Sequence, residues 1–582
     1  MIDIDQRIFQ WAAMGLLIYV ISKVICRYVR KKKLHVALDT KIEYALKQRQ
    51  DSIEWAKRVS SAMSGVTRQE IVRKTFSQLQ ECLQSGSLSA EFVLIAYIGA
   101  ALEAHEETNC IVLFLKESID EARELDKNAQ NSSYKKSPLF GIPLSVKETP
   151  GVRGSTFTFG GAARLTGPRN DDDPFFVKAA RENGAVPFVL TNTPLSCMTY
   201  TTISPVYGTT THPLRKDRTS GGSTGGEGAL IGSGGSILGL GGDIGGSIRI
   251  PAAYCGFAGF KPAAHRMSLL HYGKTLPGRP FLWPADGPMA RSMDACAQVL
   301  RITWQNNRVN MIDPFKPPVN FREELFEKGR KYKIGYFTSS EFITVLPAME
   351  KAVLKAKDIL EGEGHELVPF DPPGMDKLVK FKLGLYAMDG LEYHSRVLNT
   401  DRIPQEFKLH ARFTTFPLWL KKLMGFSAKL VGDRIIAEKW SHFPTTGADV
   451  QALIHEYYIF RCTFVEAMQA QGIDAILSCP VPSPALKIAT PINLGPGSSM
   501  LTGLYNLLDF GAGVVKVSEW TDQDDKDLEG YRPKDEFERT IKEESKESNG
   551  LPIAVQVASP PYRDEIALRI LCDLEEALQK KQ

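Results

Sequence analysis

The segment best suited to chemistry is Gly221–Gly246, in which 13 of 26 residues are glycine. It reads GGSTGGEGALIGSGGSILGLGGDIGG and is followed at once by Ser247-Ile248-Arg249. Glycine admits positive φ and lets backbone N–H groups approach a ligand with no Cβ in the way. A loop built from such residues is suited to binding an anion or to stabilising an oxyanion in a transition state.

Other glycine-rich motifs fit this segment poorly. A phosphate-binding P-loop needs GxxxxGK[ST], and the segment contains no lysine; a dinucleotide fingerprint needs GxGxxG, which no register supplies. A flexible linker would lack the embedded apolar runs and the charged Glu227, Asp243 and Arg249. These observations favour a structured functional loop.

Ser223 lies in a local GxSxG pattern, Gly221–Gly225, which is also the nucleophile elbow of α/β-hydrolases. That motif requires a hydrophobic strand directly before it, whereas residues 212–220 are polar and contain a proline. No histidine partner can be nominated from the sequence either. The elbow interpretation is therefore disfavoured.

Several ordered motifs resemble the amidase signature family, and within it the membrane-anchored fatty acid amide hydrolases of animals. They are PLSVKE at residues 143–148, GGSTGGEGA at 221–229, GDIGGSIRIP at 242–251, LYNLLDFGAGVV at 504–515 and GLPIAVQ at 550–556. The resemblance covers nearly the whole chain. It implies an α/β fold with a mixed β-sheet core surrounded by helices, and an N-terminal transmembrane helix.

The resemblance also implies roles for individual residues. The family's nucleophile falls on Ser247, its bridging serine on Ser223 and its lysine base on Lys147. The oxyanion donors fall on the backbone amides of Ile244, Gly245, Gly246 and Ser247. A substrate-contacting position falls on Cys197, where the family carries methionine.

The chemistry of these residue types agrees with the implied roles. A serine hydroxyl needs a positioned base to act as a nucleophile near pH 7. Lysine can be that base only when neutral, and burial can lower its pKa of about 10.4 by roughly 3–5 units. Lys147 ends the apolar run Phe140–Val146, so we expect it to enter the core instead of pairing with Glu148 at the surface.

Ser223 would pass protons between Lys147 and Ser247, and back to the leaving nitrogen. That return matters more for amides than for esters, because an amine anion is the poorer leaving group. A plain structural role for Ser247, as a helix N-cap, is compatible with this function.

The apolar stretch Ile8–Cys26 is 19 residues long, and a basic cluster, Arg27 to Lys33, follows it. A helix of that length reaches roughly 28 Å, close to the thickness of a bilayer core. A buried core helix is the alternative. We expect residues 1–33 to form a single-span anchor, with everything downstream in the cytoplasm by the positive-inside rule. The endomembrane system, such as the endoplasmic reticulum, is the expected location.

Residues 34–102 are predicted to form a helical segment packed on the catalytic body, with a capping box at Thr67–Glu70. Residues 103–582 are predicted to form the catalytic domain, because short β-branched runs alternate there with helical patterns. Those runs are Ile111–Leu115, Ile142–Val146, Ala185–Leu190, Lys333–Tyr336, Ala475–Leu477 and Ile553–Val557. The acidic stretch Asp522–Asn549 is predicted to be a surface excursion with one helix.

Residues 408–432 contain no acidic side chain but many aromatic, leucine, lysine and arginine residues. This composition is typical of an interfacial amphipathic helix, which Pro417 and Gly425 would divide into shorter pieces. An ordinary core helix pair or a dimer contact is the alternative. The resemblance favours a membrane-facing cap at the mouth of an acyl-chain channel.

Composition excludes several other functions. The formal net charge of +4 gives no basic footprint for nucleic acid. The nine cysteines form no CxxC pair and the histidines no HExxH motif, so neither a disulfide framework nor a metal site is expected.

We expect a cofactor-free, homodimeric serine hydrolase that cleaves fatty acid primary amides and N-acylethanolamines, lipid amides that reside in the membrane. One alternative is an amidase of the same fold that acts on a soluble amide, and another is a catalytically silent membrane scaffold.

Overall fold

The structure is a computed structural model that describes residues 2–270, 281–340, 342–430, 432–441, 443–490 and 495–580. A few side chains within these ranges are not described, chiefly in residues 2–27.

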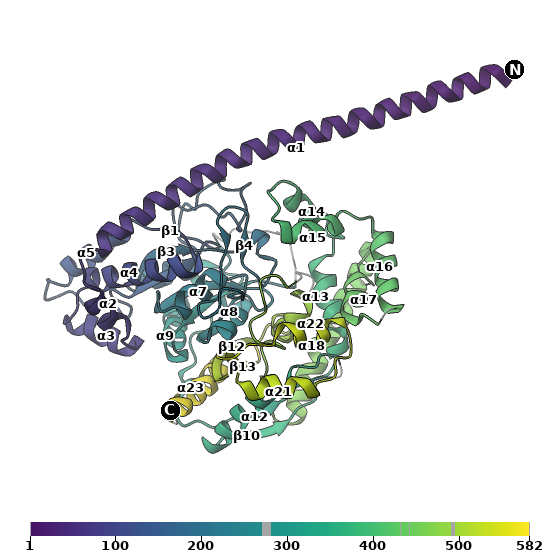
Figure 1. Cartoon of the computed structure of the whole chain (residues 1–582). Coiled ribbons are helices and arrows are strands. Elements are labelled where there is room, and N and C mark those ends of the chain that lie inside the picture. The colour runs from purple at the N-terminus through teal and green to yellow at the C-terminus, as the bar shows by residue number, and fades with distance from the viewer. Residues whose placement is uncertain are drawn as a thin grey trace.

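A single large mixed sheet forms the centre of the described part of the chain (Figure 1). Its eleven strands lie in the order β1-β3-β2-β6-β8-β7-β12-β13-β11-β9-β10. The strands β2, β3 and β6 run parallel, as do β9, β10 and β11, and the remaining pairings are antiparallel. The strand bounds are β1 Ile111–Phe114, β2 Pro143–Lys147, β3 Val186–Thr191, β6 Leu238–Asp243, β7 Ala258–Lys261, β8 Ala285–Ala290, β9 Lys333–Tyr336, β10 Glu366–Pro369, β11 Ala475–Ser478, β12 Gly511–Glu519 and β13 Pro552–Ser559.

All six strands predicted from the sequence are present, with ends shifted by two residues at most. The mixed sheet surrounded by helices is confirmed. The central strand β6 was not predicted, because it lies inside the glycine-rich segment and half of its residues have no side chain to give a pattern.

Helices from all parts of the chain cover the sheet (Figure 1). Helix α7 packs on strand β6, α8 and α9 pack on β7, and α23 packs on β12. The helices that follow α4 are α5 Ser118–Asn128, α6 Phe175–Glu182, α7 Gly225–Gly232, α8 Arg249–Cys255, α9 Met293–Trp304, α10 Arg308–Ile312, α11 Glu323–Phe326, α12 Pro347–Gly362, α13 Leu378–Tyr386, α14 Glu392–Asn399, α15 Lys408–Thr414, α16 Leu418–Leu430, α17 Arg434–Ser441, α18 Gly447–Ala470, α19 Gly495–Ser498, α20 Met500–Leu507, α21 Asp522–Gly530, α22 Glu536–Glu544 and α23 Asp564–Lys580.

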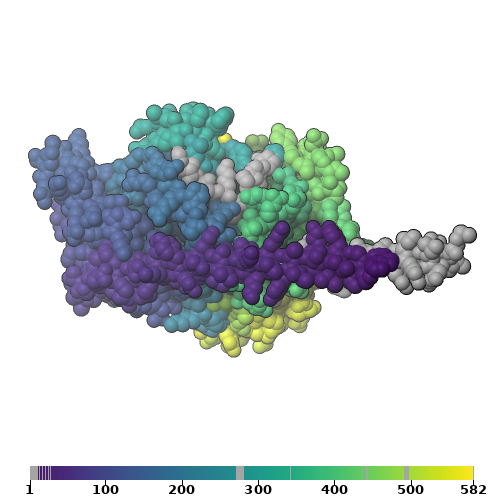
Figure 2. All heavy atoms as spheres, turned by 90° about the horizontal axis from the view of Figure 1, so that it is seen from above, coloured from purple at the N-terminus to yellow at the C-terminus, as the bar shows by residue number. Residues whose placement is uncertain are grey.

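In the N-terminal region, a single helix joins the predicted anchor to the predicted helical segment. Helix α1 runs without interruption over Ile2–Ser60. Its later part lies along the body (Figure 2), whereas its N-terminal part projects away from it (Figure 1). Helices α2 Gly65–Val72, α3 Phe76–Ser85 and α4 Ala90–Thr108 follow, and the later part of α1 packs against α4 and β1. The predicted capping box is wrong: Ser64, not Thr67, caps α2, accepting a hydrogen bond of 3.1 Å from the Thr67 amide.

Among the described residues, the structure contains no helix with the length and hydropathy of a membrane span. Several side chains of the predicted span Ile8–Cys26 lie outside the described residues.

The segment 408–432 folds as α15 and α16, and the break between them falls at Pro417 as predicted. Gly425, however, lies inside α16 and does not divide it. The acidic excursion 522–549 contains two helices, α21 and α22, instead of the one predicted.

Candidate active site

The side chain of Lys147 enters the core from the end of strand β2, as the sequence predicts. It is 3% exposed, and its Nζ donates a hydrogen bond of 2.8 Å to Ser223 Oγ. Burial lowers the pKa of the Lys147 amine, although the carboxylates of Asp286, Asp243 and Glu148 oppose that shift. A lysine with a lowered pKa is neutral over a wider pH range and so can accept a proton.

Glu148 does not pair with Lys147, which excludes the surface ion pair considered from the sequence. Its carboxylate instead accepts hydrogen bonds from the Thr158 hydroxyl and from the Gly160 amide, and burial raises its pKa to about 7. Lys147 is therefore held by a neutral partner, Ser223.

The loop Ile244–Ser247 connects strand β6 to helix α8, and the carboxylate of Asp243 at the end of β6 organises it. Asp243 accepts hydrogen bonds from the Gly246 amide at 2.7 Å and from the Ile248 amide at 3.1 Å. Because the Gly246 N–H is engaged in this way, the amides of Ile244, Gly245 and Ser247 are the candidates for binding an oxyanion.

A buried arginine holds Asp243 in turn. Arg249 forms an ion pair with Asp243 in which both side chains are completely buried, and it also donates to the Thr502 carbonyl and to Asn506 Oδ1. Together with hydrogen bonds from Asn506, the guanidinium holds the pKa of the Asp243 carboxyl well below its usual range. The network fixes the loop against α20, which comes from a distant part of the sequence.

Ser247 lies at the inner wall of a cavity and is 3% exposed. Its side chain does not cap α8, whose N-cap residue is Ile248. Among the described residues no hydrogen bond joins the hydroxyls of Ser247 and Ser223 in this conformation; Ser223 follows a cis peptide bond from Gly222. The nucleophile elbow is absent, since no strand precedes Ser223.

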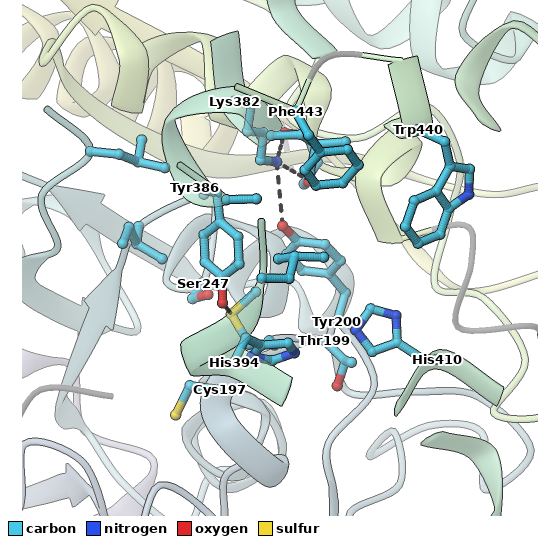
Figure 3. Close-up of a pocket in the computed structure, with 18 residues that line it drawn as sticks. Cys197, Thr199, Tyr200, Ser247, Lys382, Tyr386, His394, His410, Trp440 and Phe443 are labelled. Atoms are coloured by element: carbon cyan, nitrogen blue, oxygen red, sulfur yellow. Dashed lines mark hydrogen bonds between the residues drawn. The ribbon is translucent and has the colours of Figure 1, made fainter. Parts of the chain in front are cut away.

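A cavity opens in front of Ser247 (Figure 3). Cys197, for which a substrate contact is predicted, lies on its wall together with Ile244 and Gly245 of the loop. The remainder of the lining is largely apolar and includes Leu282, Leu383, Leu391, Trp440 and Phe443. Such a cavity suits a hydrophobic chain better than a small polar molecule.

Sequence reasoning missed Lys382, a second lysine that lines this cavity. It lies on α13, and its Nζ donates to the carbonyl and hydroxyl of Ser499 and to the Tyr200 hydroxyl (Figure 3). A signal was available, because Lys382 shares the i, i+3, i+4, i+7 face of α13 with the buried Leu378, Phe381 and Leu385.

Comparison with known proteins points to one family. The family model described as Amidase matches residues 93–568. "Fatty acid amide hydrolase 1" of Caenorhabditis elegans is 34% identical over 97% of this chain and 99% of its own length. "Fatty-acid amide hydrolase 1" of Sus scrofa is 34% identical over 86% of this chain and 84% of its own length. A solved structure described as "Fatty acid amide hydrolase" superposes with a TM-score of 0.77 at 22% identity, covering 93% of this chain and 95% of that one.

The family match and the named relatives identify a serine hydrolase that cleaves amides. The length of the family match and the identity to near full-length relatives show that the chain belongs to the amidase family.

Proposed function

We propose that this amidase hydrolyses fatty acid amides, with Ser247 as nucleophile, Ser223 as proton relay and Lys147 as base. The observation that carries the proposal is the hydrogen bond between the buried Lys147 amine and Ser223. Ser247, the proposed nucleophile, lines a largely apolar cavity. The curated relatives named as fatty acid amide hydrolases support the substrate class.

The first half of the reaction acylates Ser247. Neutral Lys147 takes the proton of Ser223 while Ser223 takes that of Ser247, whose Oγ attacks the amide carbonyl carbon. The relay requires the Ser247 hydroxyl to rotate toward Ser223 when substrate binds. The carbonyl oxygen becomes an oxyanion, which the amides of Ile244, Gly245 and Ser247 stabilise in this mechanism; each such donor contributes about 2.7–4 kcal/mol.

The collapse of this intermediate breaks the C–N bond. The proton held on Lys147 returns through Ser223 to the leaving nitrogen, which departs as ammonia or a primary amine. Water then attacks the acyl ester of Ser247 by the same relay and releases the fatty acid. Every proton taken in the first step is returned, so the enzyme's residues complete the cycle.

The substrates proposed are primary fatty acid amides and N-acylethanolamines. The test is a panel of oleamide, oleoyl ethanolamide, acetamide and glutamine, assayed with the full-length enzyme in detergent. Preference for the two oleoyl amides supports the proposal. Preference for acetamide or glutamine would identify an amidase acting on soluble amides, and failure of a fluorophosphonate to label Ser247 would point to a silent scaffold.

We further propose that residues 8–26 anchor the enzyme in a membrane. The described side chains of this stretch include Trp11, Leu17, Ile18, Tyr19 and Ile25, all more than half exposed. Such a row of exposed apolar side chains favours burial in lipid. Deleting residues 1–33 and measuring extraction by detergent, by salt and by carbonate tests this anchor.

The helix α16 is the proposed second membrane contact, beside the cavity. Trp419, Leu423, Phe426 and Leu430 are more than half exposed along it, which supports an interfacial role. Lys421, one of the lysines of the segment 408–432, adds no charge to this surface, because it is 2% exposed and donates to the carbonyls of Gly390 and Thr414.

The membrane contact of α16 is tested by flotation of the truncated enzyme with anionic liposomes. The double change Trp419→Glu and Phe426→Glu should abolish flotation, whereas Tyr458→Glu, at an exposed position of α18, serves as the control. An unchanged flotation would assign α16 to another contact, such as the predicted homodimer, which sedimentation would detect. Imaging the full-length protein tests the proposed endoplasmic reticulum location, and protease protection tests the cytoplasmic orientation.

A further inference from the structure

Lys382 brings a cationic group into an otherwise largely apolar cavity. Its Nζ lies 3.5 Å from the position that a Cβ on Gly245 would occupy, and so close to the loop whose amides face the reacting carbonyl. Three groups accept hydrogen bonds from the amine there: the Ser499 carbonyl at 3.0 Å, the Ser499 hydroxyl and the Tyr200 hydroxyl at 3.5 Å. Lys382 therefore lies next to the place where substrate chemistry occurs.

The partners of Lys382 are all uncharged. Within the described residues, no carboxylate forms an ion pair with its Nζ, and the acid that most influences it, Asp243, is already paired with Arg249. Placing an ammonium among apolar side chains without a counterion is costly, so such a group either loses its proton or pairs with an opposite charge. A group perturbed in this way inside a cleft is a candidate for a functional site. Consistent with this cost, burial lowers the pKa of Lys382 to about 7.

We propose that Lys382 forms a carboxylate-binding subsite of the cavity, which completes its ion pair only when an acidic ligand is bound. The inference rests on the proposed function, because that function supplies two sources of such a ligand. One is the fatty acid product, whose carboxylate forms beside Gly245. The other is a fatty acid amide whose amine portion carries a carboxylate, such as a fatty acyl conjugate of an amino acid.

Hydrolysis of such a conjugate needs no further reagent. Water is consumed, the acyl–nitrogen bond breaks, and the products are the fatty acid and the free amino acid. The subsite would thus set which head groups the enzyme accepts, or how strongly its product inhibits it. A purely structural role for Lys382, in which it ties α13 to Ser499, predicts no dependence on ligand charge.

The first experiment uses the unaltered full-length enzyme in detergent. The quantity measured is the ratio of kcat/KM for N-oleoylglycine to that for oleoyl ethanolamide, followed from pH 6 to 9. Taking a ratio cancels the titration of Lys147, which affects both substrates equally. The ratio should fall at least fivefold as the pH rises through 7, because Lys382 then loses its charge.

The other charged or titratable groups near Lys382 are Tyr200, Asp243 and Arg249, with His394 and His410 elsewhere on the cavity wall. Burial raises the pKa of the Tyr200 phenol, and the Asp243 carboxyl has a lowered pKa, so neither changes charge over this range. Repeating the series with Lys382→Met distinguishes the effect of the two histidines from that of Lys382, because the pH dependence due to Lys382 disappears in this variant.

The second experiment compares Lys382→Met with Lys380→Met. Lys380 lies two residues earlier on α13 and forms an ion pair with Glu456 outside the cavity, so it controls for loss of a lysine from this helix. Lys382→Met should lower the N-oleoylglycine to ethanolamide ratio at pH 6.5 at least tenfold and weaken inhibition by oleate at least tenfold. Lys380→Met should change neither, and inhibition by oleyl alcohol should be the same in all three proteins.

The outcomes distinguish the two sources of the carboxylate, and they distinguish failure of the Lys382 subsite from failure of the proposed function. A change in the ratio alone assigns the subsite to the head group, and a change in oleate inhibition alone assigns it to the product. If neither quantity depends on Lys382 or on pH in the unaltered enzyme, the carboxylate subsite is wrong. If no oleoyl amide is hydrolysed at all, the proposed function fails, and equilibrium binding of oleate against oleyl alcohol still tests Lys382.

Discussion

Replacing Lys147 by methionine tests the acid–base mechanism most directly. Methionine has a similar length and no titratable group, so it fills the buried space beside Ser223 without accepting or donating a proton. The change removes two functions from one site: the base that activates Ser247 and the acid that protonates the leaving nitrogen. Hydrolysis of an amide needs both functions. Hydrolysis of an ester, whose leaving group departs as an alkoxide, depends mainly on the first.

The size of the effect follows from these two roles. A positioned proton-transfer group contributes about 10²–10⁴-fold, which corresponds to about 2.7–5.4 kcal/mol of transition-state stabilisation. We expect kcat/KM for oleamide to fall by about 10³-fold or more, and that for methyl oleate by roughly 10–100-fold. The ratio of amide to ester hydrolysis should therefore fall at least tenfold.

The pH profile provides an independent readout. Burial lowers the pKa of Lys147, so the unaltered enzyme gains activity as the pH rises toward that pKa and then reaches a plateau. The Lys147→Met enzyme has no such group, and its remaining activity should rise about tenfold per pH unit as hydroxide replaces the base.

Both substrates are assayed from pH 6 to 10, with thermal unfolding and fluorophosphonate labelling as controls for folding. Equal losses on amide and ester, or a plateau retained in the variant, would refute the role assigned to Lys147.

Four further changes test other parts of the site. Ser247→Ala should abolish both turnover and fluorophosphonate labelling, whereas Ser223→Ala should only weaken them; the reverse result would restore the nucleophile elbow. Gly246→Ala should lower kcat at least tenfold, because this glycine has a φ of +117° and a Cβ there would lie 2.3 Å from a threonine hydroxyl. Arg249→Met should lower the free energy of unfolding by about 3–5 kcal/mol, since it leaves Asp243 buried and unpaired; denaturant titration measures this, and an unchanged midpoint would contradict it.

Two parts of the candidate site have a local signature in the sequence and were predicted from it. The apolar run before Lys147 marks β2 and its buried end, and the glycine-rich segment marks the loop around Ser247. Within that segment, glycine was interpreted as freedom of the backbone, but much of it serves close packing. A Cβ on Gly239 would lie 2.1 Å from Glu227 Oε2, so the glycines of β6 let α7 approach the sheet.

Contacts between distant segments could not be predicted in the same way. Ser499 and Tyr200 are separated by about 300 residues, and only the fold brings both to the amine of Lys382. For the same reason the burial of Lys421 was missed: a sequence pattern shows which residues share a helix face, but not which face meets the loop at Gly390.

Because α1 is one unbroken helix, the N-terminal segment is joined to the body by continuous helix instead of by a flexible linker. Ion pairing of Asp39 with Arg402 and a hydrogen bond of 3.1 Å from Lys41 to the Ala163 carbonyl fix its later part to the body. Each residue turns a helix by about 100°. The direction in which the side chains of residues 8–26 point around the helix axis therefore fixes the direction in which the cavity mouth points. Two alanines inserted after Lys33 would rotate the body by about 200°, and seven would nearly restore the original direction. The surface to which the N-terminal part of α1 binds thus determines the direction in which the candidate active site faces.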